Sequence, residues 1–281
     1  MSRAPHRAAV EGSRFVTSQA GSRSRVLLLG AMGRMGVSVR AALADDAQLV
    51  LGAALEARAH PALGAELAPG VKLGADLTAA LVGVDVAIAF ATPAASLGLM
   101  RAAAERGLPC AVGTTGFNAD EQREIAAIAQ HCALIATANF SVAVNVLKHL
   151  TQEAARMLGP DYDAEILELH HAAKVDAPSG TALELARSIE TGRGAERGRV
   201  LAREGHTGVR TLGAIGLQAL RGGDNPGEHT VLFMGRGERL ELAHRAATRD
   251  HFARGAVRAA AWLRTKPAGL YGMAEVLGLA R

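Results

Sequence analysis

Two adjacent imidazoles and a lysine lie close together in the middle of the chain, at His170, His171 and Lys174. An imidazole exchanges protons near neutral pH, and a lysine offers a positive charge and a second proton donor. The turn-forming sequence Asp-Ala-Pro-Ser-Gly follows, and it predicts that a helix begins at Thr181. The amides of Gly180 and Thr181 at that helix start, together with the Thr181 hydroxyl, could bind a carboxylate. The segment therefore predicts acid–base chemistry on an anionic substrate.

A strand is expected to carry these histidines to the site. Residues 164–169 alternate polar and apolar in part, which is typical of a half-buried strand. Successive strand side chains point to opposite faces, so His170 and His171 should have different roles, one catalytic and the other in substrate contact. Two other interpretations stay open. The histidines could be a solvated strand end without a function, or paired zinc ligands. No cysteine or third spaced ligand lies nearby, so we expect no metal.

A glycine-rich turn follows a short apolar strand near the start of the chain. Residues 25–29 are predicted to form the strand, Gly30 to Gly36 have the spacing G-x-x-G-x-x-G, and residues 37–44 are predicted to form a helix. Where side chains are missing, backbone N–H groups can approach the phosphates of a dinucleotide. Such turns also occur for packing alone. Glu56 lies 20 residues after Gly36, where a carboxylate can accept hydrogen bonds from a ribose, and this favours nucleotide binding.

The order of the other elements predicts the fold. Strands are expected at residues 48–55, 84–90, 109–112 and 133–136, with helices near 94–106 and 119–131 between them. This alternation predicts an α/β protein with a Rossmann-like, doubly wound parallel sheet. The pattern then changes to a long helix over residues 142–158 and, later, to a hairpin of residues 229–234 and 239–244. The change predicts a second, α+β domain with an open mixed sheet.

Gly113, Thr114 and Thr115 directly follow the strand predicted at residues 109–112. They therefore lie at the carboxyl edge of the sheet, where doubly wound folds bind ligands. Hydroxyls and exposed amides at this edge suit the amide group of a nicotinamide, and a plain turn is the alternative.

Composition excludes several function classes. Hydrophobic residues make up 49% of the 281 residues, enough for a large core and two domains. Residues 1–25 carry five arginines and one glutamate, 5 − 1 = +4, which equals the net charge of the whole chain. The rest is neutral, so we expect no nucleic-acid partner. Residues 1–22 are interpreted as a disordered basic extension, with a transit peptide or a misassigned start codon as alternatives.

The same composition argues against a membrane protein or a secreted one. An uninterrupted apolar run of about 18 residues is missing from the sequence, so we expect no membrane span. The two cysteines, Cys110 and Cys132, lie in apolar surroundings and are predicted to be buried free thiols. We therefore expect a soluble, cytoplasmic protein.

Several segments together resemble one enzyme family. They are Gly30 to Gly36, Gly113 to Phe117, Asn139 to Asn145, the segment from His170 to Leu183, Arg203 to Gly208, Gly227 to His229, and Gly237-Glu238. In combination they resemble the dihydrodipicolinate reductases, or 4-hydroxy-tetrahydrodipicolinate reductases, of bacterial and plant lysine and diaminopimelate synthesis. The likeness extends from Val26 to Leu279. The run His-His-x-x-Lys-x-Asp-Ala-Pro-Ser-Gly-Thr is highly specific, whereas the glycine turn is not.

The resemblance implies a domain organisation. Residues 23–140 and 250–281 would form the dinucleotide-binding domain, and residues 141–249 would bind the substrate and mediate oligomerisation. It also implies a homotetramer assembled through the sheet of the substrate domain. The family usually has glycine where this chain has Ala143, a small change close to a hinge.

The resemblance also implies residue roles. His170 would be the general acid/base and Lys174 the second proton donor, while His171, Gly180 and Thr181 would contact the substrate. The cofactor site would comprise Gly30, Ala31, Met32, Gly33, Arg34, Met35, Glu56, Gly113, Thr114, Thr115, Thr137, Ala138, Asn139 and Phe140.

The implied reaction is hydride transfer from NADH or NADPH to a cyclic imine dicarboxylate, coupled to loss of a hydroxyl group as water. Some relatives place an arginine beside the ribose-binding acid, where this chain has Ala57. NADH is therefore expected to be preferred by a modest factor, with both cofactors active. The alternatives are another two-domain amino-acid dehydrogenase and a catalytically silent nucleotide-sensing protein. Retention of both His170 and Lys174 argues against the silent protein.

Overall fold

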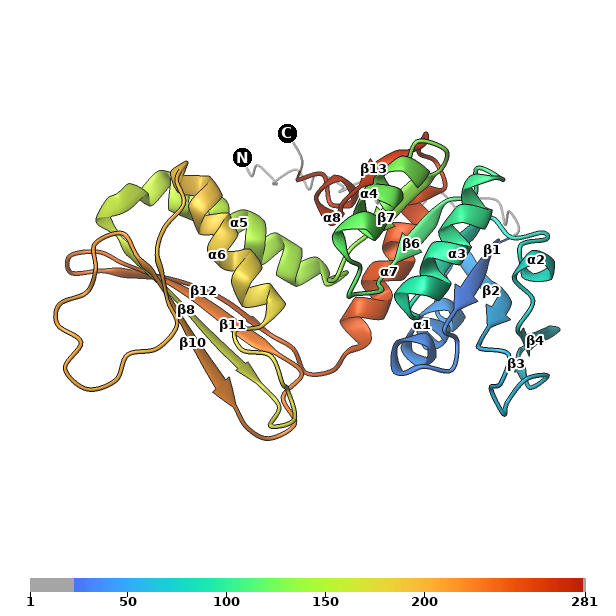
Figure 1. The fold of residues 1–281 in the computed structure, drawn as a ribbon, viewed down its shortest axis with the longest axis horizontal. Coiled ribbons are helices and arrows are strands. Elements are labelled where there is room, and N and C mark those ends of the chain that lie inside the picture. The colour runs from blue at the N-terminus through green and yellow to red at the C-terminus, as the bar shows by residue number, and fades with distance from the viewer. Residues whose placement is uncertain (1–22, 280–281) are drawn as a thin grey trace, which may run out of the picture.

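The computed structural model describes residues 23–279, so the extension predicted over residues 1–22 lies outside the described residues. Figure 1 shows two lobes side by side, each built around its own sheet. The chain leaves the first lobe at the start of α5 (Val142–Leu158) and returns to it at α7 (Asp250–Leu263). The C-terminal residues therefore complete the lobe that the N-terminal residues begin.

The first lobe contains an eight-stranded sheet in the order β13-β7-β6-β5-β1-β2-β4-β3. Neighbouring strands are parallel except for the short antiparallel pair of β3 and β4. The strands are β1 (Ser24–Leu29), β2 (Leu49–Leu55), β3 (Glu66–Ala68), β4 (Val71–Gly74), β5 (Val86–Ala89), β6 (Cys110–Val112), β7 (Ala133–Ala136) and β13 (Gly269–Tyr271).

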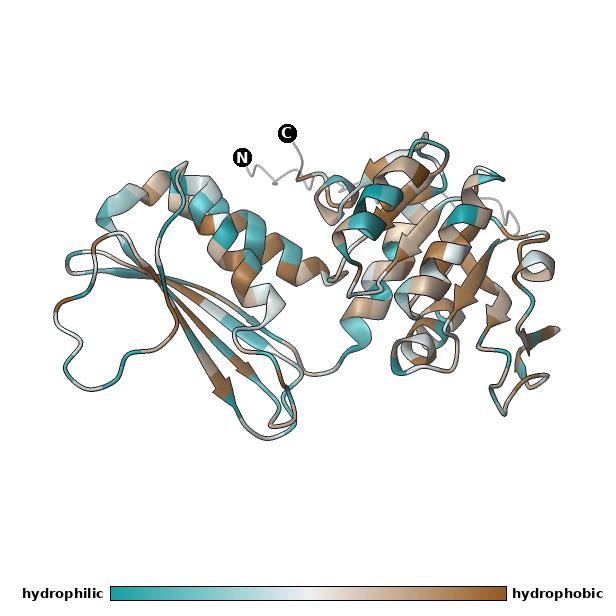
Figure 2. Cartoon of the chain, in the orientation of Figure 1, coloured by the Kyte–Doolittle hydropathy of each residue, from teal (hydrophilic) through white to brown (hydrophobic). Residues whose placement is uncertain are grey.

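Helices cover both faces of this sheet, and a separate hydrophobic core lies under each face. One core packs the strands against α1 (Arg34–Ala44), α7 and α8 (Met273–Val276). The other packs them against α3 (Pro93–Ala104) and α4 (Ala119–Ile128), with the short α2 (Leu77–Ala80) beside it. The central strands are apolar and lie between these layers (Figure 2). This arrangement confirms the predicted doubly wound parallel sheet.

The second lobe contains a five-stranded mixed sheet in the order β12-β11-β8-β10-β9. Its strands are β8 (Asp163–His170), β9 (Arg199–Val200), β10 (Ile215–Arg221), β11 (Glu228–Met234) and β12 (Arg239–Arg245). The helices α5 and α6 (Gly180–Arg193) lie over the same face, and a core that includes Ile166, Val231 and Phe233 fills the space between. A short 3-10 helix, Gly159–Asp161, joins α5 to β8. This confirms the second domain with an open mixed sheet.

The predicted elements differ from the observed ones mainly where the sequence signal is short. The long helix over residues 142–158 and the strand over residues 133–136 have the predicted bounds. The helix predicted from Thr181 begins one residue earlier, because Ser179 caps it by accepting a hydrogen bond from the Ala182 amide at 3.2 Å. Elements missed altogether are β3, β4, β9, β10, β13, α2 and α8.

Candidate active site

A cavity of about 760 Å³ opens between the two lobes and receives side chains from both. It brings together most of the residues predicted to act on a substrate. The first lobe contributes the loops after β6 and β7, and the second contributes the end of β8, the loop that follows it, and the start of α6. The predicted residues in its lining are Thr115, Thr137, Ala138, Asn139, His170, His171, Lys174, Gly180 and Thr181.

His170 is the last residue of β8 and is held by a carboxylate on its own strand. Its side chain lies on the helix-covered face of the sheet, together with that of Glu168 two residues earlier, as the two-residue period of a strand requires. His170 Nδ1 is hydrogen-bonded to Glu168, and the two side chains are 10% and 0% exposed. The sheet register places Arg221 of β10 opposite His170, and His229 of β11 opposite Glu168.

The same contacts decide the charges of these groups. Burial alone would raise the pKa of Glu168, but the Arg221 guanidinium, the Ser179 N–H and His170 together lower it below its ordinary value. Burial lowers the pKa of His170 below its ordinary value; Glu168 opposes this shift, while Lys174 and Arg221 add to it. Burial, with His170 nearby, lowers the pKa of His229 to about 3. The site thus combines an ionised carboxylate with imidazoles that release protons readily.

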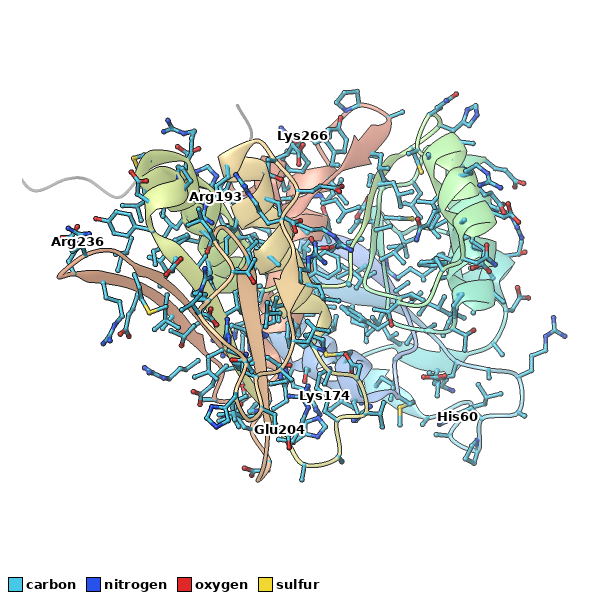
Figure 3. The ribbon with its side chains drawn as sticks, turned by 60° about the vertical axis from the view of Figure 1, so that its left-hand side comes forward. His60, Lys174, Arg193, Glu204, Arg236 and Lys266 are labelled. Carbon is cyan, nitrogen blue, oxygen red and sulfur yellow. The ribbon has the colours of Figure 1, made fainter. Side chains whose placement is uncertain are left out.

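Lys174 and His171 lie on the loop between β8 and α6. Lys174 Nζ forms a 2.7 Å ion pair with Asp176, and its side chain is 20% exposed. His171 Nε2 is 3.4 Å from a guanidinium nitrogen of Arg249, which immediately precedes α7. Figure 3 shows Lys174 on this loop, far from Arg236 at the tip of the β11–β12 hairpin. The loop therefore places the Lys174 ammonium group at the cavity and the His171 imidazole beside the Arg249 guanidinium group.

The start of α6 offers donors for an anion. Ser179 caps the helix, Gly180 is exposed, and both Gly180 and Thr181 line the cavity. Free amides at a helix N-terminus attract negative charge. Asn139, on the loop after β7, donates from Nδ2 to the Thr181 hydroxyl at 3.3 Å. This contact joins the first lobe to the start of α6.

The glycine turn lies at the carboxyl ends of β1 and β2, outside the lining of this cavity. Gly30 has φ +82°, and a Cβ placed there would lie 2.2 Å from the Phe90 carbonyl oxygen, so only glycine fits. The Glu56 carboxylate accepts a hydrogen bond from the Met32 amide at 2.8 Å. A bare backbone at a helix N-terminus with a carboxylate beside it fits the pyrophosphate and ribose of a dinucleotide.

The remaining cofactor candidates have different surroundings. Arg34, Met35, Gly113, Ala138 and Phe140 line a smaller cavity of about 270 Å³ that also contains Arg249. Thr115 is exposed, whereas Thr114 is buried and its hydroxyl is 2.6 Å from that of Ser96. Phe140 is 1% exposed and packs edge-on against Phe90, so most of its side chain belongs to the core. Gly30, Ala31, Met32, Gly33 and Glu56 line neither of these two cavities.

Sequence reasoning missed Glu168, Arg221, His229 and Arg249. Glu168 has a signal, because it lies two residues before His170 and a strand must place both on one face. The other three come from distant segments that only the sheet register and the return of α7 bring close.

Glu168, His170 and His229 offer ligand atoms within 4.8 Å of one another. Arg221 donates to both oxygens of Glu168, at 3.0 and 2.9 Å, and its charge repels a metal cation there.

Two further features bear on the class of protein. Among the helices within residues 23–279, none is both long enough and apolar enough to cross a membrane. Cys110 and Cys132 are buried free thiols, as predicted.

Comparison with known proteins agrees with this geometry. Residues 24–140 match the family model described as "Dihydrodipicolinate reductase, N-terminus", and residues 143–277 match its C-terminus counterpart. The 4-hydroxy-tetrahydrodipicolinate reductase of Anaeromyxobacter dehalogenans is 44% identical over 91% of this chain and 98% of its own length. That of Syntrophus aciditrophicus is 43% identical, over 90% of this chain and 98% of its own.

A solved structure shares the fold. It is described as a dipicolinate-bound dihydrodipicolinate reductase from a Paenisporosarcina species, with a TM-score of 0.73 and 24% sequence identity. The match covers 89% of this chain and 97% of that one. The resemblance seen in the motifs is therefore confirmed over nearly the whole length of these relatives, and the chain belongs to the dihydrodipicolinate reductase family.

Proposed function

We propose that the chain reduces 4-hydroxy-tetrahydrodipicolinate to tetrahydrodipicolinate in lysine and diaminopimelate biosynthesis, as the names of its relatives imply. The observation that carries the proposal is the single cavity in which His170, Lys174 and the start of α6 meet the loops after β6 and β7. The nicotinamide cofactor, when bound, supplies the hydride. The protein's own residues must bind a dicarboxylate, exclude water and move protons.

His170 and Lys174 are the proposed proton carriers. The hydroxyl group of the substrate leaves as water, so it must gain a proton, and Lys174 has protons to donate at the cavity wall. His170 can exchange a proton at Nε2, with its Nδ1 side fixed by Glu168, and burial lowers its pKa so that it releases this proton readily. Both residues lie on the second lobe, opposite the edge where hydride would be delivered. Proton and hydride would thus reach the substrate from different lobes.

The carboxylates of the substrate are assigned to the start of α6 and the loop before it. The Gly180 and Thr181 amides and the Thr181 hydroxyl would hold one carboxylate, and His171 would contact the substrate beside them. The positive charges of Lys174 and Arg249 at the same cavity favour a dianion.

The cofactor is assigned to the glycine turn and the carboxyl edge of the first sheet. Glu56 would accept hydrogen bonds from the adenosine ribose, and its charge disfavours the 2′-phosphate of NADPH. Arg34 and Arg58 are exposed cations near this end of the sheet, and Arg58 lies in the turn that follows β2. We therefore expect both cofactors to be used, with NADH preferred by a modest factor.

Turnover by the purified full-length chain tests the proposal. Oxidation of NADH or NADPH should depend on 4-hydroxy-tetrahydrodipicolinate, and dipicolinate should compete with that substrate. The chain should not oxidise aspartate or diaminopimelate in the presence of NAD⁺ or NADP⁺. A protein that binds NADH but never oxidises it with this substrate would be the silent sensor, and the proposed function would be wrong.

The proposal includes the organisation of the molecule. Residues 23–140 and 250–281 would bind the dinucleotide, and residues 141–249 would bind the substrate and form a homotetramer. The face of the second sheet opposite α5 and α6 supports this, because Leu167 and Leu220 are 39% and 49% exposed there. Exposed leucines on a sheet face favour burial against a second copy. Sedimentation equilibrium should give four chains per particle, and a monomer at assay concentration would contradict it.

Cytoplasmic localisation completes the proposal. Cys110 and Cys132 are unpaired although both lie in one lobe. Buried thiols of this kind suit a reducing compartment. Fractionation of the source cells should recover the activity in the cytosolic fraction.

A further inference from the structure

Glu168 is a buried charge that the substrate chemistry does not itself require. Its side chain is 0% exposed, at the centre of the second sheet and under the start of α6. A buried carboxylate is costly unless its oxygens accept hydrogen bonds and its charge is paired. Its presence beside His170 therefore needs an explanation beyond the stability of the sheet.

The partners of Glu168 fix it in one orientation. Arg221 of β10 donates to both carboxylate oxygens, at 3.0 and 2.9 Å. The Ser179 amide donates to one of them at 3.0 Å, and His170 Nδ1 meets the other. Arg221 is anchored in turn, since it also donates to the Asp176 carbonyl oxygen at 2.7 Å. Both oxygens of the carboxylate are thus fully used as hydrogen-bond acceptors, by groups that are themselves held in place.

We infer that Glu168 is a positioning residue that holds His170 with Nδ1 protonated and Nε2 free for proton transfer in the cavity. The inference rests on the proposed role of His170. An ionised carboxylate accepts hydrogen bonds only, so it selects the imidazole tautomer that carries its proton on Nδ1. It also stabilises the imidazolium that forms when Nε2 takes up a proton. Arg221 limits this stabilisation, because its charge opposes that of the imidazolium.

The charges around His170 come from several elements, and their signs give the test. Glu168 on the same strand favours the protonated imidazole, whereas Lys174 on the next loop and Arg221 on β10 disfavour it. The ring of His229 on β11 lies 5.2 Å away. Removal of Glu168 and removal of Arg221 should therefore move the titration of His170 in opposite directions. Simple loosening of the site would instead affect both variants in the same way.

The experiment compares pH profiles of kcat for the full-length enzyme and its variants. In Glu168→Gln we expect kcat to fall about 10- to 100-fold with little change in KM, as when a group that orients a histidine is lost. The limb of the profile that follows His170 should move to lower pH. In Arg221→Met the same limb should move to higher pH. This direction holds whether His170 acts as the acid or as the base, because it depends only on the titration.

A matched control is available at the far end of α6. Glu190 accepts two hydrogen bonds from Arg199, at 3.1 and 2.7 Å, and its side chain is 12% exposed. Glu190→Gln therefore removes a similarly paired, mostly buried charge away from the cavity. We expect its pH profile to equal that of the wild type.

Two results would overturn the inference. In the first, the limb of the pH profile that follows His170 shifts in the same direction in both folded variants, or does not shift. This would show that Glu168 only stabilises the sheet. If Glu168→Gln does not fold, an unchanged limb in Arg221→Met is already decisive against it. A His170→Ala enzyme with wild-type turnover is a separate outcome, because it would contradict the proposed role of His170 itself.

Discussion

The two ends of the proposed active site are built from different parts of the polypeptide. At the glycine turn the chain offers backbone, and Gly30 is needed because any Cβ would meet the Phe90 carbonyl oxygen at 2.2 Å. At the other end it offers side chains, and His170 depends on Glu168 and Arg221 from two adjacent strands. Both ends belong to one proposed active site, yet different changes should damage each.

This contrast shows how the two ends can fail. A site made of backbone is lost when a side chain is added, because atoms already occupy the space. A site made of buried side chains is lost when one group is removed, because its partners are left unpaired. Each kind of variant should therefore affect one ligand and leave the other unchanged.

Removal of the proton carriers should have the largest effect. We expect His170→Ala and Lys174→Ala each to lower kcat by about 10²- to 10⁴-fold, the usual range for a positioned proton donor or acceptor. NADH affinity, measured by fluorescence titration, should stay within about twofold of the wild type, since neither residue contacts the glycine turn.

Lys148→Ala provides a control for loss of a lysine at the rim of the same cavity, where Lys148 pairs with Glu184 at 3.1 Å. Its turnover should fall by less than about tenfold, because it pairs with a half-exposed carboxylate. Turnover of Lys174→Ala equal to that of Lys148→Ala would mean that Lys174 is only another cavity cation.

Addition of one methyl group at the glycine turn should have the converse effect. In Gly30→Ala the new Cβ cannot be placed without moving the strand end or Phe90, and the φ of +82° adds strain of about 1 kcal/mol. We expect NADH affinity to fall at least about tenfold while dipicolinate affinity, measured by calorimetry, is retained.

Gly64→Ala separates strain from collision. Gly64 has φ +86°, but its added Cβ meets no atom within 4 Å. It should show the loss of stability without the loss of NADH affinity. Equal NADH affinity in the two variants would contradict the proposed contact between the glycine turn and the cofactor.

Acid should weaken the second lobe through its buried histidines. Burial lowers the pKa of His229 from 6.5 to about 3, so the unfolded chain binds a proton at a pH where the folded chain does not. Its contribution to stability is complete above the unfolded pKa and is lost as pH falls through 6.5 toward 3, by at most roughly 1.4 kcal/mol per pH unit. His170 and His244 of the same lobe act in the same direction, and so does His251 on α7 of the first lobe.

His229→Gln should therefore flatten this dependence. Between about pH 6.5 and 5.5, the free energy of unfolding from urea titrations should decrease less in the variant, by up to about 1.4 kcal/mol. The exposed His131 on the first lobe is the control, and His131→Gln should behave as the wild type. If His229→Gln keeps the full pH dependence, the acid sensitivity has another origin.

The backbone-built end of the proposed site could be predicted largely from the sequence. Strand, glycine turn and helix are local, so the G-x-x-G-x-x-G spacing and the position of Glu56 are enough to locate this end. The long α5 was also predictable, because its apolar period is sustained over many residues. The short strands β3, β4 and β13 were not, since their three or four residues do not form a continuous buried run, unlike the equally short β5, β6 and β7.

The side-chain-built end was predictable only in part. His170, His171 and Lys174 could be recognised because they lie in one segment of unusual composition. Glu168 was overlooked although it shares the strand, and Arg221 could not be found, because β10 itself was missed and its Ile-Gly-Leu-Gln-Ala-Leu-Arg run has no clear period. Partners from different strands depend on the sheet register, which a single sequence does not state.

The smallest expected effect concerns the choice of cofactor at the backbone-built end. Ala57 is exposed, directly follows Glu56, and begins a turn in which the His60 amide donates to the Ala57 carbonyl oxygen at 2.9 Å. An arginine at position 57 could reach a 2′-phosphate that Glu56 repels. In this solvated place one added charge contributes about 1 kcal/mol, so Ala57→Arg should raise the NADPH to NADH ratio of kcat/KM by about fivefold. The ratio is measured for the wild type and for the variant from initial rates at low ionic strength, since salt screens the effect.

Ala59→Arg separates a specific contact from a general increase in charge. Ala59 is exposed in the same turn, two residues further from Glu56. If proximity to the ribose decides the preference, Ala59→Arg should change the ratio by less than half as much as Ala57→Arg. Equal changes would mean that the whole turn acts only through its net charge. A wild-type enzyme that strongly prefers NADPH would instead show that Arg34 and Arg58 already bind the phosphate, so that charged side chains as well as bare backbone define this end of the cleft.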